Sequence, residues 1–183
     1  MTEQASSTVV RKKSELWGWI RFLLVLALVY LIVNNLTGLM RVSGQSMEPT
    51  LQHGDILLIN KASLFVDKPK YGDVVVVEEE SLGYKIVKRV IAVEGDTVAI
   101  VDGVTFVNGE QLVELYTYGK SEDMEELTVG AGQLFVVGDN RTLGESLDSR
   151  SPSLGPIAIG DVKGYVAASL WPMHGIAKPL DLN

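Results

Sequence analysis

The chain has 183 residues, of which 46% are hydrophobic, and a formal net charge of −7. This length suits one compact domain plus an anchor, and the acidic balance argues against a nucleic-acid surface, which needs a basic cluster to neutralise phosphates. The absence of cysteine excludes disulfides, a thiol nucleophile and thiolate metal sites. Because His53 and His174 have no ligand partners at a recognisable spacing, we expect no metal and no cofactor.

An apolar run from about Leu16 to Leu36 predicts a transmembrane helix over residues 16–37. As a helix it is about long enough to cross a hydrocarbon core of ~30 Å. Only Arg41 follows the run closely, whereas four basic residues precede it or lie near its start: Arg11, Lys12, Lys13 and Arg21. The positive-inside rule therefore predicts a cytoplasmic tail over residues 1–15 and an extracytoplasmic location for residues 38–183.

A cleavable signal peptide is the competing interpretation of this run, since it also has a basic segment followed by an apolar core. The run is longer than the apolar core of a typical signal peptide, however. The residues that follow it, 33–39, contain no Ala-x-Ala site. We therefore favour an uncleaved anchor.

Residues 38–183 have the pattern of short strands broken by turns. Asp102–Gly103 is a strong two-residue hairpin signal, and Asn108–Gly109 is a second turn directly after it. The pattern predicts a mainly β fold, a curled and largely antiparallel sheet, with an acidic cap insertion over about residues 110–132. The expected strands are Asp55–Asn60, Asp73–Val77, Lys85–Val93, Thr97–Val101, Val104–Val107, Gln133–Val137, one at Ile157, and Val162–Ala168.

Ser46 and Lys88 are the candidate catalytic pair. Ser46 lies in the segment Ser-Gly-Gln-Ser-Met-Glu-Pro-Thr, just after the apolar run, and Lys88 lies in an expected strand. A serine needs a base to become a nucleophile, and a desolvated lysine can serve because burial disfavours its charged form. Such pairs are a known variant of acyl-transfer catalysis. Taken alone, each segment is more often an ordinary turn or a solvated strand face.

A third segment, residues 138–150, combines turn formers, acids, arginines and serines after a strand. On its own it predicts a salt-bridged turn. Together with Ser-Gly-Gln-Ser-Met-Glu-Pro-Thr, Gly-Asp-Val-Val-Val-Val and Lys-Arg-Val-Ile-Ala-Val-Glu-Gly-Asp, in this order after an N-terminal anchor, it resembles the bacterial type I signal peptidases. The single anchor and small cap resemble the Gram-positive form of that family.

The resemblance implies a role for each matching residue. Ser46 matches the nucleophile, Lys88 the general base, and Ser146 the serine that orients the lysine amine. The backbone N–H of Ser46 would donate to the oxyanion. Four further residues match the supporting charges of the family: Asp148, Arg150, Arg89 and Asp139. The resemblance also implies that apolar Val42 and Val87 line shallow pockets that fit alanine.

Two departures from the family pattern concern the site. Gly44 stands where some members have a serine whose hydroxyl is a second oxyanion donor, so a backbone or water donor must replace it here. Residues 142–145 stand where the commoner form has two residues, which lengthens the loop before Ser146.

The expected activity is that of a membrane-anchored serine endopeptidase that removes signal peptides from exported preproteins after Ala-x-Ala-like sites. Its expected partners are preprotein signal peptides, the lipid membrane and, beside it, the secretion translocon. Three alternatives remain at this point. They are a serine–lysine self-cleaving repressor-type peptidase, against which the anchor and the acidic charge argue, a non-enzymatic membrane-anchored β-domain, and a triad that pairs Ser46 with His53.

Overall fold

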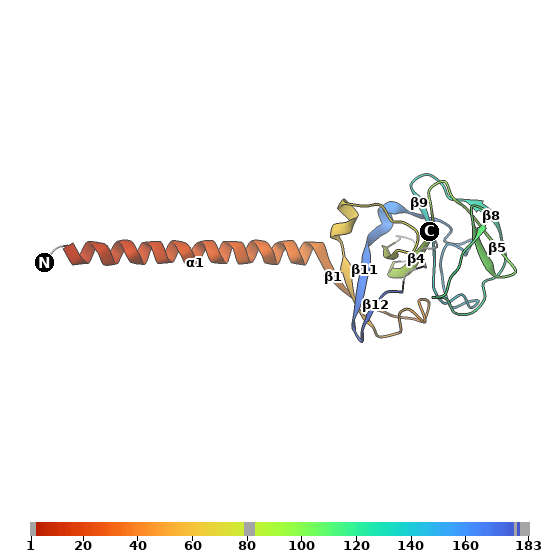
Figure 1. Cartoon of the computed structure of the whole chain (residues 1–183), viewed down its shortest axis with the longest axis horizontal. Helices are drawn as coiled ribbons and strands as arrows, with labels where there is room; N and C mark the ends of the chain where they lie inside the picture. The colour runs from red at the N-terminus through yellow and green to blue at the C-terminus, as the bar shows by residue number, and fades with distance from the viewer. Residues whose placement is uncertain (1–2, 79–82, 178, 180–183) are drawn as a thin grey trace. The chain divides into compact units, whose positions relative to one another are not determined.

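The computed structural model describes residues 3–78, 83–177 and 179, and the chain divides into two compact units after Leu36. The first unit holds one α-helix, α1 (Glu3–Leu36), drawn in red and orange in Figure 1. Its stretch Glu15–Leu36, of 22 residues, is long and apolar enough to cross a membrane. The helix thus begins within the expected tail and continues without a break through the expected span.

The second unit contains an eight-stranded sheet in which β1-β2-β11-β3-β4-β9-β10 are neighbours in that order and β12 pairs with β11. Every pair in this sheet is antiparallel, which confirms the predicted fold class. Irregular register in the pairings of β11 bends the sheet, as bulges do. The strands are β1 (Thr37–Arg41), β2 (Ile56–Asn60), β3 (Val74–Glu78), β4 (Lys85–Val93), β9 (Gln133–Val137), β10 (Ile157–Ala158), β11 (Val162–Trp171) and β12 (Met173–Gly175).

Short 3-10 helices supplement the strands, at η1 (Ala62–Phe65) and η2 (Ile159–Asp161).

A smaller four-stranded sheet has the order β7-β6-β5-β8. It consists of β5 (Thr97–Val101), β6 (Val104–Val107), β7 (Glu110–Gln111) and β8 (Met124–Thr128). The two predicted turns occur in it, and their four residues all have positive φ, as a tight two-residue hairpin turn requires: Asp102, Gly103, Asn108 and Gly109. The acidic segment expected as a cap supplies β7 and β8 of this sheet.

Both faces of the main sheet are covered, because successive valines of β3 belong to different core clusters. Val74 and Val76 pack in one cluster with Leu57, while Val75 and Val77 pack in another. A third cluster joins apolar side chains of β4 and β9 to those of β5 and the segment after β8. This third cluster fixes the small sheet against the β4–β9 pair.

Strand β4 has neighbours on both sides along only part of its length. Its first half pairs with β3 from Lys85 to Arg89, and its second half pairs with β9 from Arg89 to Val93. Within the described residues, Lys85–Lys88 therefore have a strand on one side only. We call this stretch the open edge of β4.

Candidate active site

Ser46 and Lys88, distant in the sequence, meet at hydrogen-bonding distance. Lys88 Nζ lies 2.7 Å from Ser46 Oγ. Ser46 sits in a turn after β1, and its carbonyl accepts a 3.0 Å bond from the backbone N–H of Asn140. Lys88 projects from the open edge of β4 and is only 2% exposed. The hydroxyl is therefore approached by an amine from within the protein.

Burial lowers the pKa of Lys88 to about 8. Desolvation of the ammonium is the largest cause, and the Arg150 guanidinium lowers the pKa further, whereas the carboxylates of Asp148 and Asp139 raise it. A neutral amine can accept a proton, while an ammonium cannot. The environment therefore makes the basic form of Lys88 accessible near neutral pH.

Ser146 lies beside this pair, across Gly138. A methyl group on Gly138 would collide with both the Ser46 carbonyl oxygen and Ser146 Oγ, so the three residues are packed without spare room. The Ser146 hydroxyl donates a 2.5 Å bond to Asp148 Oδ2. With its proton committed to Asp148, the Ser146 oxygen can act only as an acceptor toward a further group, such as a lysine amine.

Asp148 is held as a carboxylate by Arg150. The guanidinium donates to its two oxygens at 2.9 and 2.8 Å, and the Gly138 N–H donates at 3.0 Å. Burial alone would raise the pKa of Asp148, but the bonds and charge of Arg150 outweigh it, so the pKa is lowered. Asp148 thus stays ionised and keeps the Ser146 proton directed at itself.

Arg89 and Asp139 form a second, separate ion pair, with both side chains fully buried. Two bonds of 2.8 and 2.7 Å join them, and Asp139 also accepts a 2.5 Å bond from the Thr50 hydroxyl. The remaining Arg89 donors reach the carbonyls of Gly72 and Ala177. The pair connects the turn that carries Ser46, strand β4 and the loop after β9.

Sequence reasoning missed a third pair, between Arg141 and Glu114. Arg141 donates to both Glu114 oxygens and to the Gly138 carbonyl, the latter at 2.9 Å. Arg141 belongs to the Gly-Asp-Asn-Arg segment, which was a recognisable signal. Nothing in the sequence marks Glu114, because it is one of several acids in the segment from β7 to β8.

Val42 and Val87 belong to one buried cluster, and each is 7% exposed. They come from the chain just before Ser46 and from the residue before Lys88. The structure therefore brings these two predicted pocket residues together beside the pair.

Within the part of the chain that the structure describes, neither histidine is hydrogen-bonded to Ser46. Gly44 N–H donates to His53 Nδ1 at 3.1 Å, and His174 Nε2 lies 3.2 Å from Asp55 Oδ2. The Gly44 N–H is thus occupied by His53. Among the described residues no group of three potential ligands could hold a metal ion.

Comparisons with known proteins agree on one family. The family model described as signal peptidase, peptidase S26, matches residues 16–171. Signal peptidase I of Bacillus amyloliquefaciens is 31% identical over 95% of this chain and 97% of its own length, and signal peptidase I T of Bacillus subtilis (strain 168) has the same identity and coverage. The crystal structure of a signal peptidase I from Enterococcus faecalis aligns with a TM-score of 0.48 and 29% identity, over 55% of this chain and 98% of that one.

Proposed function

The chain belongs to the signal peptidase family, peptidase S26, and is a membrane-associated serine endopeptidase; from this premise we propose that it cleaves preproteins after Ala-x-Ala-like sites with Ser46 as nucleophile and Lys88 as general base. The observation that carries this proposal is the 2.7 Å approach of the Lys88 amine to the Ser46 hydroxyl. It is supported by a lysine pKa of about 8.

In the proposed mechanism, neutral Lys88 takes the Ser46 proton as Oγ attacks the scissile carbonyl carbon. The tetrahedral intermediate collapses when the C–N bond breaks, and Lys88 returns the proton to the leaving amine. Water then attacks the acyl-enzyme carbonyl carbon while Lys88 takes one of its protons. When the C–Oγ bond breaks, Lys88 returns this proton to Ser46 Oγ, and the signal peptide leaves with a new terminal carboxylate as its remaining proton passes to solvent. Ser146 is proposed to accept a hydrogen bond from the amine during the reaction and to keep it aimed at Ser46, whereas in the structure the amine bonds to Ser46 and Ser146 to Asp148.

The proposed oxyanion donor is the backbone N–H of Ser46. Among the described residues it has no hydrogen-bond acceptor, so it is available to a developing negative charge. The Gly44 N–H is engaged by His53. Removing one oxyanion donor typically costs about 10²–10³ in rate, so a water or the movement of Gly44 would supply a useful second one.

The proposed substrate conformation is an extended strand added to the open edge of β4. Strand addition uses main-chain hydrogen bonds for affinity and pockets for alternate side chains. Val42 and Val87 lie in one buried cluster beside this edge, and we propose that they line the pockets that prefer alanine. Residues before the scissile bond would run along Lys85–Val87 and reach Ser46 next to Lys88.

The proposed orientation is single-pass, with residues 1–15 cytoplasmic and the peptidase domain outside, beside the secretion translocon. It rests on the excess of basic residues before the span. The domain itself offers apolar side chains to a bilayer. Five of them lie along β1 and at the turns of β2 and β11 and are 70–85% exposed: Leu39, Phe65, Val66, Trp171 and Met173. Exposed apolar side chains of this size favour contact with the lipid membrane.

Cleavage of one purified preprotein by the full chain in detergent tests the proposal. Ser46→Ala and Lys88→Ala should each abolish cleavage, and the double variant should be little worse, because residues that act as a unit are not additive. His53→Ala and His174→Ala serve as controls and should retain most activity. Cleavage that survives Lys88→Ala, or a folded histidine variant without activity, contradicts the assignment of this pair.

A further inference from the structure

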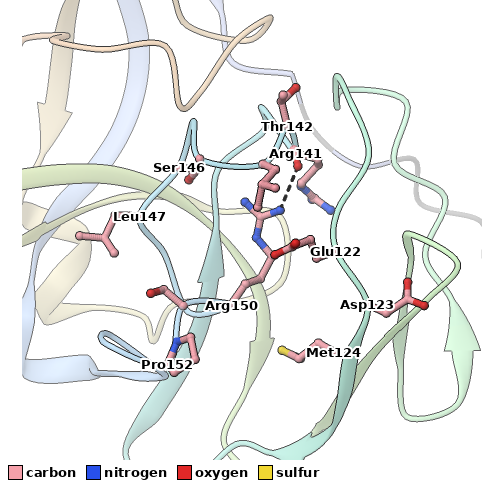
Figure 2. A pocket seen from close by; sticks show the side chains of 12 residues that line it. Glu122, Asp123, Met124, Arg141, Thr142, Ser146, Leu147, Arg150 and Pro152 are labelled. Carbon is pink, nitrogen blue, oxygen red and sulfur yellow. Dashed lines mark hydrogen bonds between the residues drawn. The ribbon is translucent and has the colours of Figure 1, made fainter.

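A pocket of about 380 Å³ lies between the long loop before Ser146 and the start of β8 (Figure 2). Figure 2 shows Ser146 and Leu147 on one side, Glu122, Asp123 and Met124 on the other, and the Arg150 side chain between them. Its lining thus unites the lengthened loop with the acidic segment, the two features that the proposed mechanism leaves without a role.

The pocket adjoins the active site through Ser146. Ser146 is part of its lining, and it packs across Gly138 from the Ser46 carbonyl. The register of β4 and β9 indicates that the pocket lies on the mature-protein side of the scissile bond. Arg89 pairs with Val137, so the chain that follows Val137 begins alongside Lys88. A substrate that reaches Ser46 along the open edge of β4 meets Gly138 next and must continue over Ser146 toward the pocket.

The charges around the pocket do not cancel. Arg150 is paired with Asp148, and Arg141 with Glu114, so both guanidinium groups are already neutralised. Asp123 is exposed and accepts a bond only from the backbone N–H of Gly103 among the described residues. Glu122 is exposed and has no hydrogen-bond or ion-pair partner within the described part of the chain. Neither carboxylate thus has an ion-pair partner among the residues that the structure describes, and a basic side chain, Lys120, packs on Gly103 beside Asp123.

Part of the remaining lining is apolar, and part is polar, including Thr142 and Ser151. Leu143 is 68% exposed and Leu147 is 36% exposed, and Met124 and Pro152 complete the apolar surface. Lysine and arginine combine an apolar stem with a charged head, and they bury the stem along apolar surface while the head stays near water and counter-charge. A pocket with an apolar patch beside carboxylates that lack an ion-pair partner fits such a side chain.

We infer that this pocket is a specificity subsite that receives a lysine or arginine side chain from the mature part of the preprotein, within a few residues after the scissile bond. The inference rests on the proposed function, since it uses the same substrate direction. The stem lies between the leucines of the loop and Met124, and the charged head reaches Glu122 and Asp123. The subsite thus recognises the mature protein, on the C-terminal side of the scissile bond.

Peptides with one Ala-x-Ala site and a single lysine at the first, second, third or fourth position after the cut test this subsite in the full chain. The matching peptides carry alanine or glutamate there. We expect one position at which kcat/KM is highest for the lysine peptide, lower for alanine and lowest for glutamate. The lysine peptide should be cleaved about three- to fivefold better than the alanine peptide, which corresponds to the free energy of a partly exposed ion pair. The advantage should shrink in 0.5 M salt because of screening.

Variants of the acidic segment then locate the effect. Glu122→Gln should remove most of the lysine advantage, and Glu122→Lys should reverse it, both with unchanged rates on the alanine peptide. Leu143→Ala should lower kcat/KM for the lysine peptide through KM. Glu126→Gln is the matched control, because Glu126 is an exposed acid on β8 outside the pocket lining. It should preserve the wild-type order.

The outcomes separate this inference from the function on which it rests. Equal cleavage of all peptides overturns the subsite and leaves the proposed function standing. An equal loss of the lysine preference in Glu122→Gln and in Glu126→Gln also overturns the subsite, since the preference would then come from the overall negative charge of the acidic segment. Absence of cleavage of every peptide overturns both.

Discussion

The carboxylate of Asp139 holds the Arg89 guanidinium with two hydrogen bonds, of 2.8 and 2.7 Å, and accepts a third from Thr50. Arg89 follows Lys88 in β4, Asp139 follows Gly138, and Thr50 closes the turn that begins at Ser46. One buried carboxylate therefore sets the relative positions of the three segments that meet at the site. Removal of its charge should disturb stability and geometry together.

Asp139→Asn is the first prediction. It keeps the size of the side chain but leaves the Arg89 charge buried without a counter-charge, which typically costs about 3–5 kcal/mol. Urea unfolding of the full chain in detergent should show this loss, and cleavage should fall with it. Asp67→Asn is the control, since Asp67 pairs with Lys70 at the surface, and it should cost at most about 1 kcal/mol. Equal stability of the two variants would contradict a structural role for Asp139.

The pH dependence of cleavage is the second prediction. In the proposed mechanism Ser46 is activated only when Lys88 is neutral, and the pKa of Lys88 is lowered to about 8. The neutral fraction grows as pH rises, so kcat/KM on an Ala-x-Ala peptide should rise along one ionisation near pH 8 and then level off. Lys88→Arg should be inactive at every pH, because a guanidinium stays protonated. A flat profile from pH 6 to 10 would rule out the lysine base.

A stability gain in Lys88→Met is the third prediction. The lowered pKa means that the folded state disfavours the ammonium, at a cost of roughly 3 kcal/mol at low pH by the conversion of 1.36 kcal/mol per pKa unit. Methionine is similar in length and carries no charge. At pH 6 the inactive variant should therefore melt several degrees above the wild type.

The pH dependence of the stability difference between Lys88→Met and the wild type tests this explanation. Between pH 8 and 10.5, the two pKa values of Lys88 in the folded and unfolded chain, the unfolded chain binds the proton and the folded chain does not. Wild-type stability therefore rises with pH in this window. The advantage of Lys88→Met should shrink across it, and a constant difference in melting temperature from pH 6 to 10.5 would contradict the origin assigned to the shift.

Gly138→Ala is the fourth prediction. The added methyl would meet the Ser46 carbonyl and the Ser146 hydroxyl, so it should displace both groups and reduce kcat by at least about tenfold, as small misplacements of catalytic groups do. Gly160→Ala is the matched control, since a methyl there meets nothing within 4 Å. Wild-type kcat in both variants would show that the three groups are less tightly packed than described.

Topology is the fifth prediction. The basic residues before the span predict that protease added to intact protoplasts digests the peptidase domain and spares the N-terminal tail. A tag at each end of the chain makes the two halves distinguishable on a blot. Protection of the domain in intact protoplasts, with digestion after lysis, would reverse the proposed orientation.

Much of the fold could be predicted because strand and turn signals are local. The valines of β3 and the Asp102–Gly103 and Asn108–Gly109 turns were sufficient to locate their elements. Strand β1 was missed because Thr37–Arg41 continues the apolar character of the span. Strand β8 was missed because Glu125 and Glu126 face solvent and read as a loop.

The candidate site was predictable in part for the same reason. Asp148 and Arg150 pair within one loop, and two opposite charges so close in the sequence favour a local ion pair. The partners of Arg89 and Arg141 come from distant segments, and a contact across the fold leaves no periodicity in the sequence. The Ser46–Lys88 approach was expected only because several ordered motifs resembled a known family.

The open edge of β4 has a consequence for when a protein can be processed. In the proposed binding mode, a cleavage site lies flat against Lys85–Lys88 over several residues, and a segment already engaged in a helix or in another sheet has its main-chain groups committed elsewhere. This mode would leave alanine-rich sequences inside folded proteins uncleaved, because their main chain could not pair with β4. The junction between signal peptide and mature protein would then have to remain unfolded until it is cut, and the enzyme would distinguish a newly exported chain from a finished one by its conformation.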